Sequence, residues 1–128
     1  MTPGDERFST GALTIDAVFA GPGSALVLKW RGKSTDRMAS KLLGPFLGAA
    51  LDRARTLGVP LEMHFEELDY LNSSTVTALI QLVQDARNKS VRLAIVFDSR
   101  VRWQRLTFDA LKVFVTGDGA FELRATSN

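Results

Sequence analysis

The chain has 128 residues, of which 45% are hydrophobic and 23% charged, and this suits one domain with its own core. It has no cysteine, which excludes disulfides, thiolate metal sites and cysteine nucleophiles. Sixteen basic residues against 14 acidic ones give a formal net charge of +2, too small an excess to indicate nucleic-acid binding.

The first residues of the chain are polar. Residues 1–11 include Pro3, Gly4 and Gly11, and we expect a flexible tail there, followed by a folded domain over residues 12–128. The N-terminus lacks the basic and apolar regions of a signal peptide, and no apolar run approaches the ~20 residues of a membrane-spanning helix. We therefore expect a cytoplasmic protein with no membrane partner.

Two strands open the predicted domain. Residues 13–19 alternate apolar and polar side chains, a Gly-Pro-Gly turn follows, and residues 25–30 form a second strand, which together favour an antiparallel hairpin. The next segment, Gly32-Lys33-Ser34, looks like part of a P-loop. A P-loop needs a glycine five positions earlier, where Val27 stands, so we expect a loop leading into a helix.

Residues 38–57 carry apolar side chains at helical spacing. Pro45 interrupts the pattern, and proline removes a backbone donor and clashes with the preceding turn. We therefore expect the helix to start or kink at Pro45. Gly58 should end the helix, and Pro60 prevents its continuation.

The only histidine lies in the next predicted strand, residues 61–66, where apolar and polar residues alternate. Glu62, His64 and Glu66 share its polar face. A metal site or an acid–base site is one interpretation of this trio, and a solvated strand face gives the same pattern. We prefer the solvated face and expect no catalytic or metal site, because nothing else supplies a further ligand or an orienting partner.

The stretch around residues 68–80 organises the rest of the chain. It has the pattern of a strand end, a short turn and an amphipathic helix that starts within Asn72 to Thr75. Asn72, Ser73, Ser74 and Thr75 are residue types that cap helices through their side-chain oxygens. The free N–H groups and the dipole of a helix start also suit a phosphate, so the turn is either an ordinary cap or a phosphorylation switch.

Residues 76–86 continue the amphipathic helix, residues 91–97 form another strand, and Asp98-Ser99 should cap a third helix. Arg100, Arg102 and Arg105 crowd its first turns, where the helix dipole disfavours cations. They form either a solvated face or a contact patch for an acidic partner. Residues 121–123 are a candidate last strand.

The element order predicts an α/β fold with a mixed sheet. Strand–helix–strand units favour parallel neighbours, and the opening hairpin adds an antiparallel pair. Since the strand at residues 61–66 has a polar face, we expect the helices to lie mainly on the other face of the sheet.

The element order and the turn Tyr70-Leu71-Asn72-Ser73-Ser74 resemble the STAS domain of bacterial anti-sigma-factor antagonists over residues 13–115. The family signature at this turn is Asp-Ser-Ser/Thr-Gly-Leu, and its phosphoacceptor directly follows the Asp. The resemblance therefore implies Ser73 as the phosphoacceptor, with Asn72 in place of the Asp and Thr75 in place of the Gly.

The SiaC-like regulatory phosphoproteins, a STAS-like branch, resemble the turn more closely, with Tyr-Leu-Asn followed by Thr or Ser and then Ser. The resemblance again implies phosphorylation of Ser73, with Ser74 as the rival. It implies a non-enzymatic, cofactor-free partner-switching protein, modified by a serine kinase of the anti-sigma-factor type and restored by a PP2C-type phosphatase.

The unmodified form would hold its target, either that kinase or a signalling enzyme such as a diguanylate cyclase. The expected partner-binding residues are Asn72, Ser73, Ser74, Thr75, Arg100 and Arg102. The alternative is a STAS-like scaffold or ligand-binding module that is never phosphorylated.

Overall fold

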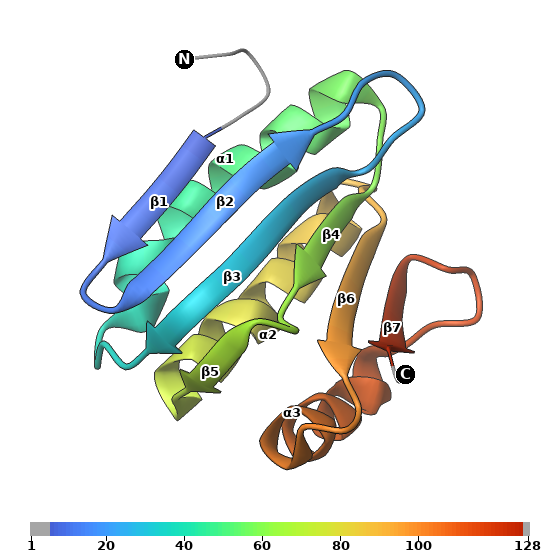
Figure 1. The fold of residues 1–128 in the computed structure, drawn as a ribbon. Coiled ribbons are helices and arrows are strands. Elements are labelled where there is room, and N and C mark those ends of the chain that lie inside the picture. The colour runs from blue at the N-terminus through green and yellow to red at the C-terminus, as the bar shows by residue number, and fades with distance from the viewer. Residues whose placement is uncertain (1–5, 127–128) are drawn as a thin grey trace.

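Seven strands form one mixed sheet in the computed structural model, which describes residues 6–126 (Figure 1). The strands are β1 (Glu6–Thr10), β2 (Leu13–Phe19), β3 (Leu26–Ser34), β4 (Leu61–His64), β5 (Leu68–Leu71), β6 (Leu93–Asp98) and β7 (Phe121–Thr126). The helices are α1 (Ala39–Leu57), α2 (Ser73–Asn88), α3 (Arg102–Asp109) and a 3-10 helix, η1 (Ala110–Phe114). The spatial order of the strands is β1-β2-β3-β4-β6-β7, with β5 beside β3.

The sheet combines an antiparallel and a parallel half. Strands β1, β2 and β3 pair antiparallel, whereas β3, β4, β6 and β7 pair parallel. Strand β3 has two successive parallel partners, because Leu26–Lys29 pairs with β4 and Gly32–Ser34 pairs with β5. The mixed sheet predicted from the sequence is confirmed.

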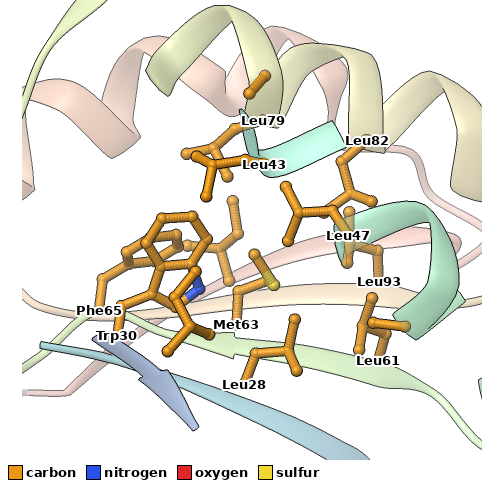
Figure 2. Close-up of a cluster of buried hydrophobic side chains, with 14 of the residues drawn as sticks. Leu28, Trp30, Leu43, Leu47, Leu61, Met63, Phe65, Leu79, Leu82 and Leu93 are labelled. Carbon is orange, nitrogen blue, oxygen red and sulfur yellow. The ribbon is translucent and has the colours of Figure 1, made fainter. Parts of the chain in front are cut away.

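The core lies between the sheet and the helices α1 and α2, which cover one face (Figure 1). Figure 2 shows side chains from β3, β4 and β6 meeting leucines of the two helices. α3 joins the same core, since its Phe108 ring lies 4.9 Å from Phe65 and 5.2 Å from Phe97. The predicted placement of the helices on one face is confirmed.

The opposite face of the sheet is lined by polar and charged side chains. Asp16 of β2 binds Arg7 and Arg31 of the flanking strands, and Glu62 of β4 binds Arg124 of β7. The alternation that placed Leu, Met and Phe residues inward puts these side chains outward. Ion pairs therefore crosslink this face, between adjacent strands at Asp16 and across the intervening β6 at Glu62.

The expectation of a flexible tail over residues 1–11 is wrong for β1, and residues 1–5 lie outside the described residues. β1 pairs with β2 along its whole length, from Glu6 opposite Ala17 to Thr10 opposite Leu13. Phe8 packs against Phe46 of α1 with ring centroids 5.2 Å apart. Pairing and this aromatic contact order a segment whose own sequence shows little strand pattern.

Helix α1 begins at Ala39 and runs through Pro45, so a helix start at Pro45 is wrong. Pro45 is exposed, while Leu43 and Leu47 on either side of it are buried, and their packing holds the helix together across the missing hydrogen bond. Gly58 ends the helix in the left-handed conformation, at a φ of 69°.

Two other boundaries differ from expectation. The strand at residues 61–66 ends at His64, and a separate strand, β5, follows after a turn. The N-cap position of α3 is Val101, whose side chain makes no capping hydrogen bond, and not Asp98 or Ser99 as expected. Asp98 instead accepts a hydrogen bond from the backbone N–H of Arg100 at 2.9 Å, which forms a turn before the helix. In contrast, the last strand predicted at residues 121–123 is confirmed, and it extends to Thr126 as β7.

Candidate functional site

Asn72 links the end of β5 to the start of α2. Its backbone is extended, its Oδ1 accepts the Thr75 N–H at 2.9 Å, and α2 begins at Ser73. The predicted helix start within Asn72 to Thr75 is confirmed. This is the side-chain cap expected of an asparagine, which satisfies one of the donors that a helix start leaves unpaired.

Asn72 also holds two segments from earlier in the chain. Its side-chain Nδ2 donates to the Asp36 carbonyl at 2.9 Å, and its backbone N–H donates to the Ser34 carbonyl at 3.0 Å. The turn is thereby fixed to the end of β3 and to the loop that leads into α1. One residue places three elements relative to one another.

Thr75 is fully buried. Its hydroxyl donates to Asn72 Oδ1 at 2.7 Å and lies 2.7 Å from the buried Ser34 hydroxyl. Because Thr75 has one hydroxyl proton and directs it to Asn72, Ser34 is the donor in the second bond. The expected partner contact does not hold for the Thr75 side chain, which supports the turn from inside.

Ser73 and Ser74 differ in exposure. Ser73, the first residue of α2, is exposed, whereas Ser74 is half-buried. The carbonyl of Ser74 accepts a hydrogen bond from the Ser40 hydroxyl of α1 at 3.4 Å, and the carbonyl of Ser73 accepts one from Thr77 at 3.2 Å. Of the three consecutive hydroxyl residues, Ser73 is the most accessible to a modifying enzyme.

Two of the three arginines near the start of α3 already bind other groups of the protein. Arg100 Nη2 lies 3.0 Å from Asp98 Oδ2, and hydrogen bonding from Arg100 lowers the pKa of Asp98. Arg105 Nη1 donates to the Ser99 carbonyl at 3.1 Å, while Arg102 is exposed at the first residue of α3. The patch therefore offers less unpaired positive charge than the sequence indicates.

His64 lies between two carboxylates on the outer face of the sheet. Its Nε2 is 3.0 Å from Glu62 Oε1, its Nδ1 is 3.3 Å from Glu66 Oε1, and Arg124 Nη1 is 3.0 Å from Glu62 Oε2. Burial raises the pKa of Glu62, but hydrogen bonds from His64 and Arg124 outweigh burial and lower it. Between residues 6 and 126 no group of three or more His, Asp or Glu side chains is arranged to hold a metal ion.

No family model matches the chain, and no curated protein matches it. Several solved structures match the chain. SiaC of Pseudomonas aeruginosa aligns with a TM-score of 0.60 at 18% identity, over 97% of this chain and 98% of that one. A DUF3478-family protein from Shewanella loihica, described as having a SpoIIAA-like fold, aligns with a TM-score of 0.56 at 17% identity, over 93% and 90%. The chain has a SpoIIAA-like fold.

The STAS-like fold expected from the element order and the turn is confirmed by these structures, and the likeness extends over nearly the whole chain. Within this SpoIIAA-like fold, no described helix is both long enough and apolar enough to cross a bilayer. The likeness establishes the fold, and the local geometry of the Asn72 turn must carry any argument about function.

Sequence reasoning missed three residues that hold the site: Ser34, Asp36 and Gln104. Gln104 of α3 is fully buried, and its side chain donates to the carbonyls of Phe65 and Leu68 at 2.7 and 3.1 Å. It also accepts the Asp98 N–H at 2.8 Å. Gln104 precedes the buried Phe108 by one helical turn, and a glutamine on the apolar side of a helix was the available signal.

Proposed function

We propose that this protein is a non-enzymatic partner-switching regulator of the anti-sigma-factor-antagonist type, controlled by phosphorylation of Ser73. In this proposal the unmodified protein binds its target and the phosphorylated protein releases it. The observation that carries it is the exposed Ser73 at the first position of α2, beside neighbours that keep the turn in place. The fold shared with SiaC supports it.

A phosphate at Ser73 changes the surface more than the fold. It adds about −1.5 to −2 charge and three acceptor oxygens. The first N–H groups of a helix have no acceptors within the helix and the helix dipole favours an anion, so α2 tolerates the phosphate. The hydrogen bonds of Asn72, Ser34 and Thr75 leave the Ser73 side chain free and need not change. A docked partner, in contrast, would face a new charge.

The proposed partners follow from this switch. They are a serine kinase of the anti-sigma-factor type, a PP2C-type phosphatase, and a target that is either the kinase itself or a signalling enzyme such as a diguanylate cyclase. All of these would act on the protein in the cytoplasm, and none requires a cofactor bound to this chain.

Phosphosite mapping tests the proposal. The full chain is incubated with Mg-ATP and a serine kinase of the anti-sigma-factor type from the same organism, and its intact mass and phosphopeptides are measured. We expect one phosphate at Ser73, no incorporation in Ser73→Ala, and normal incorporation in the matched control Ser74→Ala. Phosphate at Ser74 alone would move the site by one residue, and no phosphate under any condition would defeat the switch.

Binding measurements complete the test. Ser73→Ala should keep the fold and bind the target constitutively, because its surface stays uncharged. Ser73→Asp should bind more weakly, although one carboxylate imitates a phosphate imperfectly.

The second candidate function is a scaffold or ligand-binding module that is never phosphorylated. The observation that favours it is the completeness of the cap, since Asn72, Ser34 and Thr75 satisfy one another without a phosphate. Such a module would bind its partner equally well as wild type, Ser73→Ala or Ser73→Asp.

A further inference from the structure

We propose that the surface beside Ser73 takes an acidic, amphipathic helix of the partner protein. One apolar side chain of that helix would enter a small cavity next to α1, and its carboxylates would face three basic side chains. This inference rests on the proposed function, because it names the chemistry of the partner that Ser73 controls. The surface, called the docking surface below, consists of Lys33, Arg37, Met38, Lys41, Leu42 and Tyr70.

Three large apolar side chains are exposed on the docking surface. Met38, Leu42 and Tyr70 expose 50%, 39% and 47% of their area. The Leu42 N–H donates to the Met38 carbonyl, so these two residues are one turn apart at the start of α1. Tyr70 pairs with Lys33 in the β3–β5 register. All lie at the end of the molecule where β3 and β5 end and α1 and α2 begin (Figure 1).

A cavity of about 140 Å³ opens on this surface. Its lining includes the buried side chains of Leu13, Ala39 and Leu43, together with Lys33 and Leu42 of the docking surface. A cavity of about 150 Å³ holds a benzene molecule, so this one has room for a single aliphatic or aromatic side chain. The cavity has an apolar floor and a polar rim that includes Thr35 and Asp36, and such a site suits one apolar side chain that projects from a protein partner.

The docking surface carries more positive than negative charge, since one exposed carboxylate, Asp36 at the cavity rim, faces three basic residues. Lys33, Arg37 and Lys41 are exposed, and within residues 6–126 none of them forms an ion pair. On the outer sheet face, by contrast, Arg7 and Arg31 both bind Asp16. Three free cations beside exposed apolar side chains match a partner helix with an apolar face flanked by Glu or Asp.

Two of these basic residues, Arg37 and Lys41, adjoin residues that bond to the start of α2. The bond from Asn72 Nδ2 to the Asp36 carbonyl and the bond from the Ser40 hydroxyl to the Ser74 carbonyl hold the start of α1 against the start of α2. Arg37 adjoins Asp36, and Lys41 adjoins Ser40. A phosphate on Ser73 would therefore compete with the carboxylates of the partner for Arg37 and Lys41, because phosphate forms strong charge-assisted hydrogen bonds with both residue types.

The test uses the unmodified full chain, labelled with ¹⁵N, and a synthetic helical peptide with leucines on one face and glutamates on the other. We expect the peptide to shift the amide signals of residues 33–42 and of Tyr70. A matched peptide with lysine in place of glutamate should not bind. The double variant Arg37→Glu/Lys41→Glu should weaken binding at least about tenfold. The matched control Arg55→Glu/Arg92→Glu, which reverses exposed charges beside Pro60 at the other end of α1, should not change it.

A second set of titrations tests the competition. Ser73→Asp should weaken peptide binding in the wild-type background. It should add little further loss in Arg37→Ala/Lys41→Ala, where the contested side chains are missing. An equal effect of Ser73→Asp in both backgrounds would overturn the competition.

Other results would overturn the docking surface itself. They are shifts elsewhere on the chain, no binding, equal binding of the lysine peptide, binding only to vesicles rich in phosphatidylglycerol, or self-association through these residues. The two proposals fail separately. Peptide binding at this surface with no phosphate at Ser73 defeats the switch alone, and phosphate at Ser73 with no peptide binding defeats the docking surface alone.

Discussion

Three consecutive hydroxyl residues at the start of α2 have three different environments. Ser73 is exposed, Ser74 is half-buried and Thr75 is buried with its hydroxyl committed to Asn72 and Ser34. The sequence pattern allowed a cap and a modification site as alternatives, and the structure assigns the cap to Asn72 and leaves Ser73 free. It could not be predicted which hydroxyl is buried, because Ser34 lies 41 positions earlier in the chain.

The first prediction concerns the buried hydroxyl. Thr75→Val keeps the shape of the side chain but leaves the Ser34 hydroxyl without its partner, so it should lower the free energy of unfolding by about 1–3 kcal/mol. The same change at the exposed Thr77 of α2 should alter it by less than about 0.5 kcal/mol. Urea denaturation measures both, and equal losses would show that the buried network is not what stabilises the turn.

Strand β5 is bound at its start by a side chain from outside the sheet. It has four residues, its pairing with β3 is irregular, and Gln104 binds the carbonyls of Leu68 and Phe65 at its start. Because β5 leads directly to Asn72, Gln104 connects α3 to the candidate switch. It acts as a positioning residue for that turn.

Gln104→Leu should therefore destabilise the protein. It removes three buried or partly buried hydrogen bonds, those to the carbonyls of Phe65 and Leu68 and the one from the Asp98 N–H, although the Phe65 carbonyl keeps the Leu68 N–H. We expect a loss of at least about 2 kcal/mol in the free energy of unfolding. Amide hydrogen exchange in Leu68–Leu71 should accelerate more than exchange in β2. Gln84→Leu, on the exposed side of α2, is the matched control. Uniform acceleration throughout the sheet would argue against a local role.

An ion pair at Asp16 adds to the backbone pairing that holds β1 at the edge of the sheet. Arg7 Nε lies 2.7 Å from Asp16 Oδ1, and Arg31 binds the other carboxylate oxygen. The hydrogen bond from Arg7 lowers the pKa of Asp16 below its usual 3.8; burial opposes the shift and Arg31 reinforces it. A carboxyl group with a lowered pKa in the folded state stabilises the protein above the unfolded pKa and loses that contribution as the pH falls through the folded value.

The difference in stability between the wild type and Asp16→Asn should therefore depend on pH. The wild type should be more stable than the variant from about pH 7 to about pH 5, and the difference should shrink below about pH 4. Urea denaturation at these pH values measures it. The control is Asp69→Asn, because Asp69 is exposed and forms no ion pair within residues 6–126. A difference that grows toward low pH would contradict the assigned role of Asp16.

For the molecule as a whole, the fold could be predicted from the sequence because each central element carries its own periodicity. Alternation in β2 and β4 and helical spacing in α1 and α2 are local signals. Two missed features depend on partners from other elements, β1 on β2 and Phe46 and β5 on β3. The start of α3 was missed for a local reason, because Asp98 uses its side chain in a turn with Arg100 rather than as a helix cap. The position of the candidate site could be predicted, but the roles of Ser34, Asp36 and Gln104 could not.

A prediction at this scale concerns the total charge. The formal net charge is +2, and one phosphate adds about −1.5 to −2, so phosphorylation brings it close to zero. The modified protein should elute earlier from a cation-exchange column while its circular dichroism spectrum stays the same. Kinase-treated Ser73→Ala should elute with the untreated wild type. A changed spectrum on phosphorylation would mean that the modification acts on the fold.

Strand β3 pairs with β2, β4 and β5, and these pairings should form in a definite order as the chain folds. The β2–β3 hairpin closes a short loop, whereas the pairing of β3 with β5 must wait until α1 and β4 have been brought back to the sheet. We therefore expect pulse-labelled hydrogen exchange during refolding to protect amides of β2 and β3 before those of β5 and Asn72. Under the proposed switch, a newly synthesised chain would then present Ser73 to a kinase before the surface around it is complete, so that a first phosphorylation would not have to wait for the native state.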